Sequence, residues 1–306
     1  MKKVVIAGGT GFIGSYLTSR FNKNGYDTFI VSRQPGHVSW NEAELTDALE
    51  EAELVINLAG KSINSIHSGS NKKELVSSRL NSTRKIGNAI SACKTPPKLW
   101  INASAAGIYK PSSTHGMTEK KHETDDSFLA RLVSEWENTF FDFRLPATRQ
   151  VALRTSVVLG KDGGALKPMS KLASLGLGGP QAGGQQVFSW IHIEDYFRII
   201  LFLLENPELK GIFNCTAPTP VSNKEFMFTL RDAKKVGIGI PAPEFAIRLG
   251  AKLLGTEPDL ILKSSYLIPE NLLSAGYQFN FPTLESALTD IFKTKNKLPK
   301  TRKFLA

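Results

Sequence analysis

The first half of the chain alternates short apolar runs with segments in which apolar residues recur at helical spacing. The apolar runs have the length of buried strands and cover residues 4–6, 28–31, 54–57, 99–102 and 151–158. The helical patterns lie near residues 12–21, 42–51, 72–92 and 127–143. This alternation predicts an α/β protein with a parallel sheet covered by helices on both faces. Right-handed crossovers make such a sheet doubly wound, with its ligand at the carboxyl ends of the strands.

The second half of the chain has a different pattern. Residues 176–184 contain five glycines and one proline, which predicts a long mobile segment that is either a lid or binding loop or disordered. An apolar helix is predicted over residues 190–204 and a short strand over 212–215. From Pro241 onward the pattern is helical, and it ends in a last helix near residues 284–292.

A glycine-rich turn separates the first predicted strand from the first helix. Gly8, Gly11 and Gly14 fit the spacing G-x-x-G-x-x-G, and Gly9 in place of Gly8 fits G-x-G-x-x-G. Glycine lets a turn adopt positive φ and lets the backbone approach a pyrophosphate, while the helix N-terminus offers free N–H groups to the phosphates. The turn therefore predicts dinucleotide binding. The predicted contacts from it are Gly8, Thr10, Gly11, Phe12, Ile13 and Gly14.

The residues after the second predicted strand bear on which dinucleotide binds. An NAD site places an acid there, but this chain has Ser32, Arg33 and Gln34. An arginine beside a hydroxyl suits the 2′-phosphate of NADP, which an acid would repel. We therefore predict NADP(H) as the cofactor, with Ser32 and Arg33 as contacts. The alternative is that Arg33 is a surface residue without a ligand.

Composition excludes several classes of protein. Hydrophobic residues make up 41% of the chain and charged residues 22%, which is ordinary for a globular protein. Because no apolar stretch reaches the length of a bilayer span, we expect no membrane partner, and the apolar start breaks at Gly8 without a signal-peptide cleavage site. Cys93 and Cys215 are too few for a disulfide framework, which favours the cytoplasm. His67 and His115 lack partners at metal-ligand spacing, so we expect no metal site.

The net charge of +10 is unevenly distributed along the chain. Six cations follow Asp290 with no acid among them: Lys293, Lys295, Lys297, Lys300, Arg302 and Lys303. A basic tail can contact nucleic acid or anionic lipid, but a solvated terminus is the commoner explanation. We expect a solvated tail and no nucleic-acid partner.

Landmarks spread over nearly the whole chain resemble the extended short-chain dehydrogenase/reductase superfamily, and more closely its atypical epimerase family. The general landmarks are the turn at residues 8–14, Asn57-Leu58-Ala59-Gly60, and Trp190-Ile191-His192-Ile193-Glu194-Asp195. The more specific ones are Ser78-Arg79 with Thr83, Ser104-Ala105-Ala106-Gly107, Phe128-Leu129-Ala130 with Trp136-Glu137, Ala217-Pro218-Thr219-Pro220, and the string 269–279 with Pro282-Thr283-Leu284. Some members of that family carry a label as cell-division inhibitors, a role that nothing in these residues supports.

This resemblance implies a Rossmann domain and a second lobe. Residues 1–160 and 187–220 would form the NADP-binding domain, and residues 161–186 and 221–306 a smaller, discontinuous, mostly helical substrate lobe. Leu58, Ala59 and Gly60 would be further cofactor contacts. The implied function is redox or epimerase chemistry on a small, sugar- or nucleotide-linked substrate, with hydride transfer by the nicotinamide. A catalytically silent NADP(H) sensor is the alternative, and the oligomeric state, a homodimer included, stays open.

The chain departs from the superfamily at its catalytic pair. Members use Tyr-x-x-x-Lys, in which the lysine and the cofactor lower the pKa of the tyrosine from about 10. None of the six tyrosines in this chain is followed by a lysine four residues later, and Phe128 and Leu132 stand where the pair is expected. A substitute must therefore come from other residues of the cleft or from water, or catalysis has been lost.

Three residues are candidate catalytic substitutes. Ser104 lies one residue from the position of the superfamily's catalytic hydroxyl, although a strand-end serine explains it equally well. Tyr109 could supply the missing acid, although a packed tyrosine with a satisfied hydroxyl is commoner. Arg79 could bind an anionic substrate group in bidentate fashion, or simply face solvent. His192 and Asp195 precede a predicted helix, and we expect Asp195 to cap it.

Overall fold

The computed structural model describes residues 2–253 and 257–293. Its centre is a six-stranded sheet with the strand order β2-β1-β3-β4-β5-β9, in which every pairing is parallel. The strands are β1 (Lys3–Ala7), β2 (Asp27–Val31), β3 (Leu54–Asn57), β4 (Leu99–Ala105), β5 (Arg149–Thr155) and β9 (Gly211–Cys215). The strand order reverses between β1 and β3, which makes the sheet doubly wound, as predicted.

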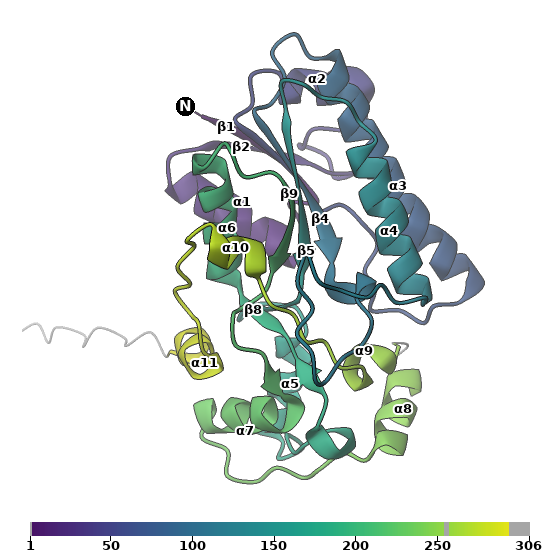
Figure 1. The fold of residues 1–306 in the computed structure, drawn as a ribbon, viewed down its shortest axis with the longest axis vertical. Coiled ribbons are helices and arrows are strands. Elements are labelled where there is room, and N and C mark those ends of the chain that lie inside the picture. The colour runs from purple at the N-terminus through teal and green to yellow at the C-terminus, as the bar shows by residue number, and fades with distance from the viewer. Residues whose placement is uncertain (1, 254–256, 294–306) are drawn as a thin grey trace, which may run out of the picture.

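Helices cover both faces of this sheet because successive strand residues point to opposite sides. Val4 and Ile6 of β1 pack with α1 and α6, whereas Val5 and Ala7 pack with α2, α3 and α4 (Figure 1). The helices are α1 (Phe12–Lys23), α2 (Glu42–Leu49), α3 (Gly69–Ala92), α4 (Phe128–Phe141) and α6 (Ile193–Glu205). The near-continuous apolar runs of the strands follow from burial on both faces.

A second hydrophobic core lies below the sheet in the view of Figure 1. It joins Phe226 and Leu230 of α7 to Leu284 and Leu288 of α11 and to Trp190. The elements not yet given are η1 (Ala106–Ile108), β6 (Val157–Leu159), α5 (Leu166–Ser174), η2 (Ala182–Gly184), β7 (Val187–Phe188), β8 (Trp190–His192), β10 (Val221–Ser222), α7 (Asn223–Ala233), α8 (Glu244–Leu253), α9 (Asp259–Leu262), α10 (Glu270–Ser274) and α11 (Leu284–Phe292). Of these, η1 lies beside α4 and α10 beside β9, at the central sheet. The exact division into two lobes stays a prediction.

Two predictions about residues 190–204 are wrong at the start of this segment. Trp190–His192 forms the strand β8, which pairs in parallel with β6, and the helix begins only at Ile193. His192 caps the helix, because its Nδ1 accepts from the backbone N–H of Glu194 at 3.1 Å. The expected cap, Asp195, is therefore not the cap. Sheet pairing with a distant strand outweighs the local helical pattern here.

The carboxylate of Asp195 instead holds the segment between α10 and α11 against α6. Its Oδ1 accepts from the amide of Asn280 and its Oδ2 from the amide of Phe281, both at 2.9 Å. The Tyr277 hydroxyl lies 3.2 Å from Oδ1 and donates to it. All three donors lie about 85 residues further along the chain, so this contact joins α6 to the segment between α10 and α11.

The glycine-rich segment at residues 176–184 is held by backbone contacts rather than extending freely. The amide of Gly179 donates to Ile240 O at 3.1 Å, and the amide of Ile240 donates to Gly176 O at 2.8 Å. A Cβ atom on Gly179 would lie 2.4 Å from the carbonyl carbon of Ile240. Glycine is therefore required by this close approach, and the mobility expected of the segment stays a prediction. The basic tail beyond Lys293 lies outside the described residues.

Replacing Asp195 with alanine should destabilise the protein by about 3 kcal/mol, because two part-buried amides and one buried hydroxyl lose a charged acceptor. Tyr277→Phe removes only one of the three bonds and should cost about 1 kcal/mol. Urea unfolding of both variants measures the difference. Equal stability of Asp195→Ala and the unmodified protein would contradict the role assigned to this carboxylate.

Candidate functional site

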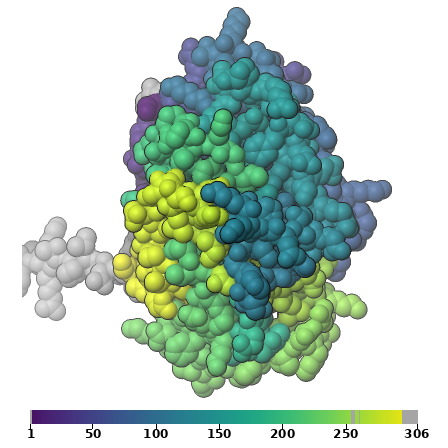
Figure 2. All heavy atoms as spheres, in the orientation of Figure 1, coloured from purple at the N-terminus to yellow at the C-terminus, as the bar shows by residue number. Residues whose placement is uncertain are grey.

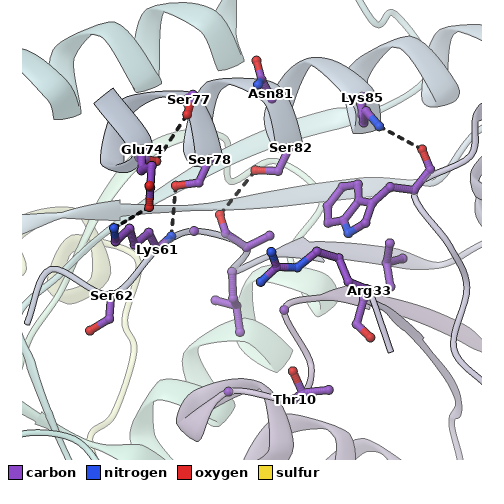
Figure 3. A pocket seen from close by; sticks show the side chains of 18 of the residues that line it. Thr10, Arg33, Lys61, Ser62, Glu74, Ser77, Ser78, Asn81, Ser82 and Lys85 are labelled. Carbon is purple, nitrogen blue, oxygen red and sulfur yellow. Dashed lines mark hydrogen bonds and ion pairs between the residues drawn. The ribbon is translucent and has the colours of Figure 1, made fainter. Parts of the chain in front are cut away.

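A cavity of about 960 Å³ lies at the carboxyl ends of β1, β2 and β3, where the strand order reverses. Two strand-to-helix turns form its floor, and one face of α3 forms its opposite wall (Figure 3). The lining residues are Gly8, Thr10, Gly11, Val31, Ser32, Arg33, Gln34, Trp40, Leu58, Ala59, Gly60, Lys61, Ser62, Glu74, Ser77, Ser78, Asn81, Ser82 and Lys85. This is the position at which doubly wound sheets bind their ligands.

Each of the glycines in the first turn is required, or allowed, for a different physical reason. Gly8 adopts a φ of +80°, and a Cβ there would lie 2.9 Å from the backbone of Leu58, so glycine permits the loop after β3 to come close. A Cβ on Gly14 would lie 2.3 Å from Gly8 O, so glycine lets α1 pack against the turn. At Gly11 the nearest atom to such a Cβ is Gly8 O at 3.4 Å, and the position opens into the cavity.

The N-terminus of α1 presents its positive end at this turn. Gly11 is the N-cap and supplies no side-chain acceptor, and the first turn of the helix contains no acid. The first amides of α1 are therefore without a side-chain partner and can donate to an anion. Thr10 and Gly11 line the cavity. Phe12, Ile13 and Gly14, the other predicted contacts, follow directly in the first turn of α1, and their contact with a cofactor stays a prediction.

Arg33 and Lys85 bring positive charge to the end of the cavity near β2. Figure 3 shows the Arg33 side chain reaching across the cavity floor. Lys85 on α3 donates to Trp40 O at 3.1 Å. Within the described residues, no carboxylate forms an ion pair with either cation, whereas Lys61 is paired with Glu74. Two uncompensated cations beside a helix N-terminus favour a ligand with several negative charges.

Ser32 is oriented by its own neighbours. Its Oγ accepts from the backbone N–H of Gln34 at 2.9 Å and lies 2.8 Å from His37 Nδ1. These contacts hold the turn after β2 in a fixed shape next to Arg33. The other predicted contacts after β3, Leu58, Ala59 and Gly60, also line the cavity.

A buried amide network fixes the loop after β3. Asn57 Oδ1 accepts from the amide of Ala59 at 3.1 Å, and Asn57 Nδ2 donates to Asn102 Oδ1 at 2.7 Å and to Thr83 Oγ1 at 3.2 Å. The indole N–H of Trp136 donates to the same Thr83 hydroxyl at 2.9 Å. Sequence reasoning did not assign these roles. The available signal was an asparagine at the end of two apolar strands, where a polar residue must find a partner.

A second buried constellation joins two of the three catalytic candidates. Ser104 Oγ donates to Glu137 Oε1 at 2.5 Å, and Arg154 binds both oxygens of Glu137, at 2.9 and 2.7 Å. Arg154 Nη1 also donates to the Tyr109 hydroxyl at 2.9 Å, which in turn donates to Asn214 Oδ1 at 2.6 Å. All five side chains are buried. Glu137 and Arg154 were not among the predicted site residues.

The hydroxyl groups of Ser104 and Tyr109 therefore both donate their hydrogen bonds to buried acceptors within the protein. Burial raises the pKa of Tyr109, although the neighbouring Arg154 guanidinium lowers it in part, so the phenol stays protonated at neutral pH. Burial opposes the charge on Arg154, but the hydrogen-bonded Glu137 carboxylate outweighs this effect and raises the pKa of Arg154. The network is thus an ion pair with two hydroxyls attached, one at each end.

Arg79, the third candidate, takes no part in this network. Its guanidinium carbon lies 5.3 Å from the ring centroid of Trp136, and Nη1 donates to Leu75 O at 3.1 Å. Burial lowers the pKa of Arg79 to about 10. Among the described residues no carboxylate forms an ion pair with it, and its side chain packs against Gly60 at the edge of the cavity. A half-buried arginine without a counter-ion is a candidate for binding an anionic group.

The positions of the usual catalytic pair hold no group that exchanges a proton. The Phe128 ring lies 5.1 Å from Lys72 Nζ and 5.6 Å from the ring of His67. Leu132 is buried in α4.

Within the described part of the chain, no group of three His, Cys, Asp or Glu side chains is arranged to hold a metal ion. No helix in the same residues is long and apolar enough to cross a bilayer.

The fold and the cavity define a doubly wound α/β protein with a cavity at its topological switch point. The chain belongs to the NAD dependent epimerase/dehydratase family, whose model matches residues 4–216. Residues 242–291 match a further domain of unknown function, DUF1731. The resemblance seen in the sequence is thereby confirmed at the level of the family.

Individual proteins are similar over most of the chain. The human epimerase family protein SDR39U1 is 37% identical over 94% of this chain and 99% of its own. The crystal structure of human SDR39U1 with NADPH superposes with a TM-score of 0.86 at 36% identity and covers 95% of this chain and 99% of that one. A nucleoside-diphosphate sugar epimerase from Corynebacterium glutamicum has a TM-score of 0.76 at 26% identity, covering 95% of this chain and 58% of its own.

Arg154→Met should destabilise the fold by about 3–5 kcal/mol, because it leaves the Glu137 carboxylate buried without a partner. The double variant Arg154→Met with Glu137→Leu should recover much of this loss, since neither charge then remains. Denaturant unfolding of the single and double variants measures the coupling. A double variant that is less stable than Arg154→Met would show that the ion pair is not the source of the effect.

Proposed function

We propose that this protein binds NADP(H) in the cavity at the switch point of its sheet. The observation that carries the proposal is the combination of three features: a helix N-terminus without a side-chain cap, the cations Arg33 and Lys85, which form no ion pair with any described residue, and the sequence Ser32-Arg33-Gln34 directly after β2, which contains no acid. The similarity to human SDR39U1, whose crystal structure contains NADPH, supports it.

The residues around the cavity fit the parts of this cofactor. The backbone from Gly8 to Gly11 and the first amides of α1 would hold the pyrophosphate. Arg33, with Ser32 beside it, would hold the 2′-phosphate. The loop at residues 58–60 would flank the cofactor on the side of β3. When bound, NADP(H) supplies hydride transfer, and the protein supplies position and a proton route.

We propose further that the substrate is a small molecule, sugar- or nucleotide-linked, that undergoes redox or epimerase chemistry. Family membership and the likeness to a nucleoside-diphosphate sugar epimerase support this class. Arg79, half-buried and without a counter-ion, would take an anionic group of that substrate. The proton route would involve Ser104, whose hydroxyl is hydrogen-bonded to the Glu137 carboxylate, or Tyr109 at the other end of the network.

A catalytically silent NADP(H) sensor is the second candidate function. The observation in its favour is that the Ser104 and Tyr109 hydroxyls donate to buried acceptors, while Phe128 and Leu132 stand at the usual catalytic positions. Such a protein would keep the cofactor cavity without a proton donor in contact with the substrate.

Arg33→Ala should weaken NADPH binding about 10-fold to 100-fold, because a charge-assisted contact to the 2′-phosphate is worth about 1.5–3 kcal/mol. Affinity for NADH, which lacks that phosphate, should hardly change. Titration calorimetry with both nucleotides measures this, and Arg84→Ala, an exposed arginine of α3 outside the cavity, is the matched control. Equal binding of NADPH and NADH by the unmodified protein would refute the 2′-phosphate contact.

Any turnover should be slow at neutral pH and rise toward alkaline pH. The raised pKa of Tyr109 means that its phenolate forms only above the ordinary value near 10, and neutral serine is a poor base. The measurement is NADPH oxidation with a panel of carbonyl compounds between about pH 6 and 10, for the unmodified protein and for Ser104→Ala, Tyr109→Phe and Arg79→Ala.

The outcomes of this assay separate the two functions. Loss of rate in one or more of the three variants supports catalysis through the proposed residues. A fast rate near neutral pH that all three variants retain would show that other residues act. Tight NADPH binding without turnover on any carbonyl compound would favour the sensor.

A further inference from the structure

Six large apolar side chains are exposed on α5, on α7 and on the loops that follow these two helices. They are Leu172, Leu175, Leu177, Phe228, Ile238 and Ile240, here called the apolar tip. Ile238 is 70% exposed, Leu175 66% and Phe228 62%. Single exposed apolar residues are ordinary, whereas a group of this size gathered on one surface marks an interaction site.

Contacts between the loops show that the apolar tip is one surface. The loop after α5 and the loop before α8 are joined by hydrogen bonds from Gly179 N to Ile240 O and from Ile240 N to Gly176 O. A Cβ on Gly176 would lie 3.8 Å from Ile238, so Ile238 sits beside Leu175 and Leu177.

Arg231 of α7 links the third part of the surface. Its guanidinium carbon lies 5.8 Å from the ring centroid of Phe228, and its Nη1 donates to Gly237 O at 2.9 Å. The guanidinium group of Arg231 thereby connects α7 to the loop that carries Ile238 and Ile240. The exposed apolar side chains thus belong to two adjacent loops and the helices next to them.

The surroundings of the apolar tip are basic. Residues 166–178 and 224–240 contain six cations, Lys167, Lys171, Lys224, Arg231, Lys234 and Lys235. They contain only two acids, Glu225 and Asp232. Within the described residues none of these eight groups forms an ion pair, so the six cations exceed the two acids without a direct carboxylate partner.

We propose that the apolar tip docks peripherally on an anionic lipid surface. Exposed aliphatic side chains on loops enter the boundary between headgroups and acyl chains, while flanking lysines and arginines contact anionic headgroups. The shape favours this partner over a folded protein. Figure 2 shows this end of the molecule as a rounded, convex surface, and a fluid bilayer adapts to such a shape without a complementary groove.

The test uses sedimentation of the full chain with vesicles of phosphatidylcholine alone or with about 30% phosphatidylserine, at low and high salt. We expect binding to the phosphatidylserine vesicles, weakened by salt. Ile238→Asp should reduce this binding at least tenfold, because a carboxylate resists entry into the acyl boundary and repels the headgroups. Leu273→Asp on α10, which is 45% exposed in the unmodified protein and lies away from the tip, adds the same charge and should bind like the unmodified protein.

Cofactor affinity and unfolding midpoint, measured on the same variants, show that Ile238→Asp still folds. Equal vesicle binding by Ile238→Asp and Leu273→Asp would overturn the proposal and attribute the binding to charge elsewhere in the chain. Absence of binding to phosphatidylserine vesicles would also overturn it. So would concentration-dependent self-association that Ile238→Asp abolishes in the absence of lipid, since the tip would then be a contact between two copies.

Discussion

The close approach of three backbone segments at the first turn is the constraint on which the rest of the structure depends. Gly8 lies against Leu58 at the end of β3, and Gly14 of α1 lies against Gly8, with less space than a Cβ atom would need. Because these segments touch, the N-terminus of α1 and the loop after β3 face the same cavity. A larger side chain at either glycine would separate helix and sheet, and the cavity would lose its shape.

The polar interior extends this arrangement across the sheet. The Asn57, Asn102 and Thr83 side chains hold the loop after β3, and the Glu137–Arg154 ion pair holds α4 against β5. Buried polar groups of this kind are costly unless every member has a partner. Here the Ser104 and Tyr109 hydroxyls donate to the buried side chains of Glu137 and Asn214. A hydroxyl held in this way is less available to a substrate, and this is the argument for a sensor over an enzyme.

The apolar tip and the Asp195 contact show how far apart in the chain the determinants of a surface can lie. The tip combines two loops about 60 residues apart, and Asp195 binds amides about 85 residues away. The expectation of no membrane partner rested on the absence of a spanning segment. Peripheral docking requires only exposed apolar residues beside cations, and exposure is a property of the folded chain.

The sequence by itself determined the parallel sheet, the glycine turn and the family. Strand alternation, helical periodicity and glycine spacing are local patterns, so the fold class and the cavity residues Gly8, Gly11, Ser32 and Arg33 could be predicted without coordinates. The contribution of Lys85 and Trp40 to the same cavity could not, because it depends on how α3 packs beside the sheet.

Only the tertiary structure decided which partner each polar side chain takes. Asp195 was expected to cap a helix, but it binds a segment that the fold brings beside it, and His192 makes the cap. Residues 190–192 have a helical pattern, but β6 draws them into a strand. Ser104 and Arg79 were both candidate catalytic residues, but the Ser104 hydroxyl donates to the buried Glu137 carboxylate, while Arg79 packs on Trp136 and forms no ion pair with any described residue. Partner choice depends on distances between segments far apart in the chain, and local sequence does not encode those distances.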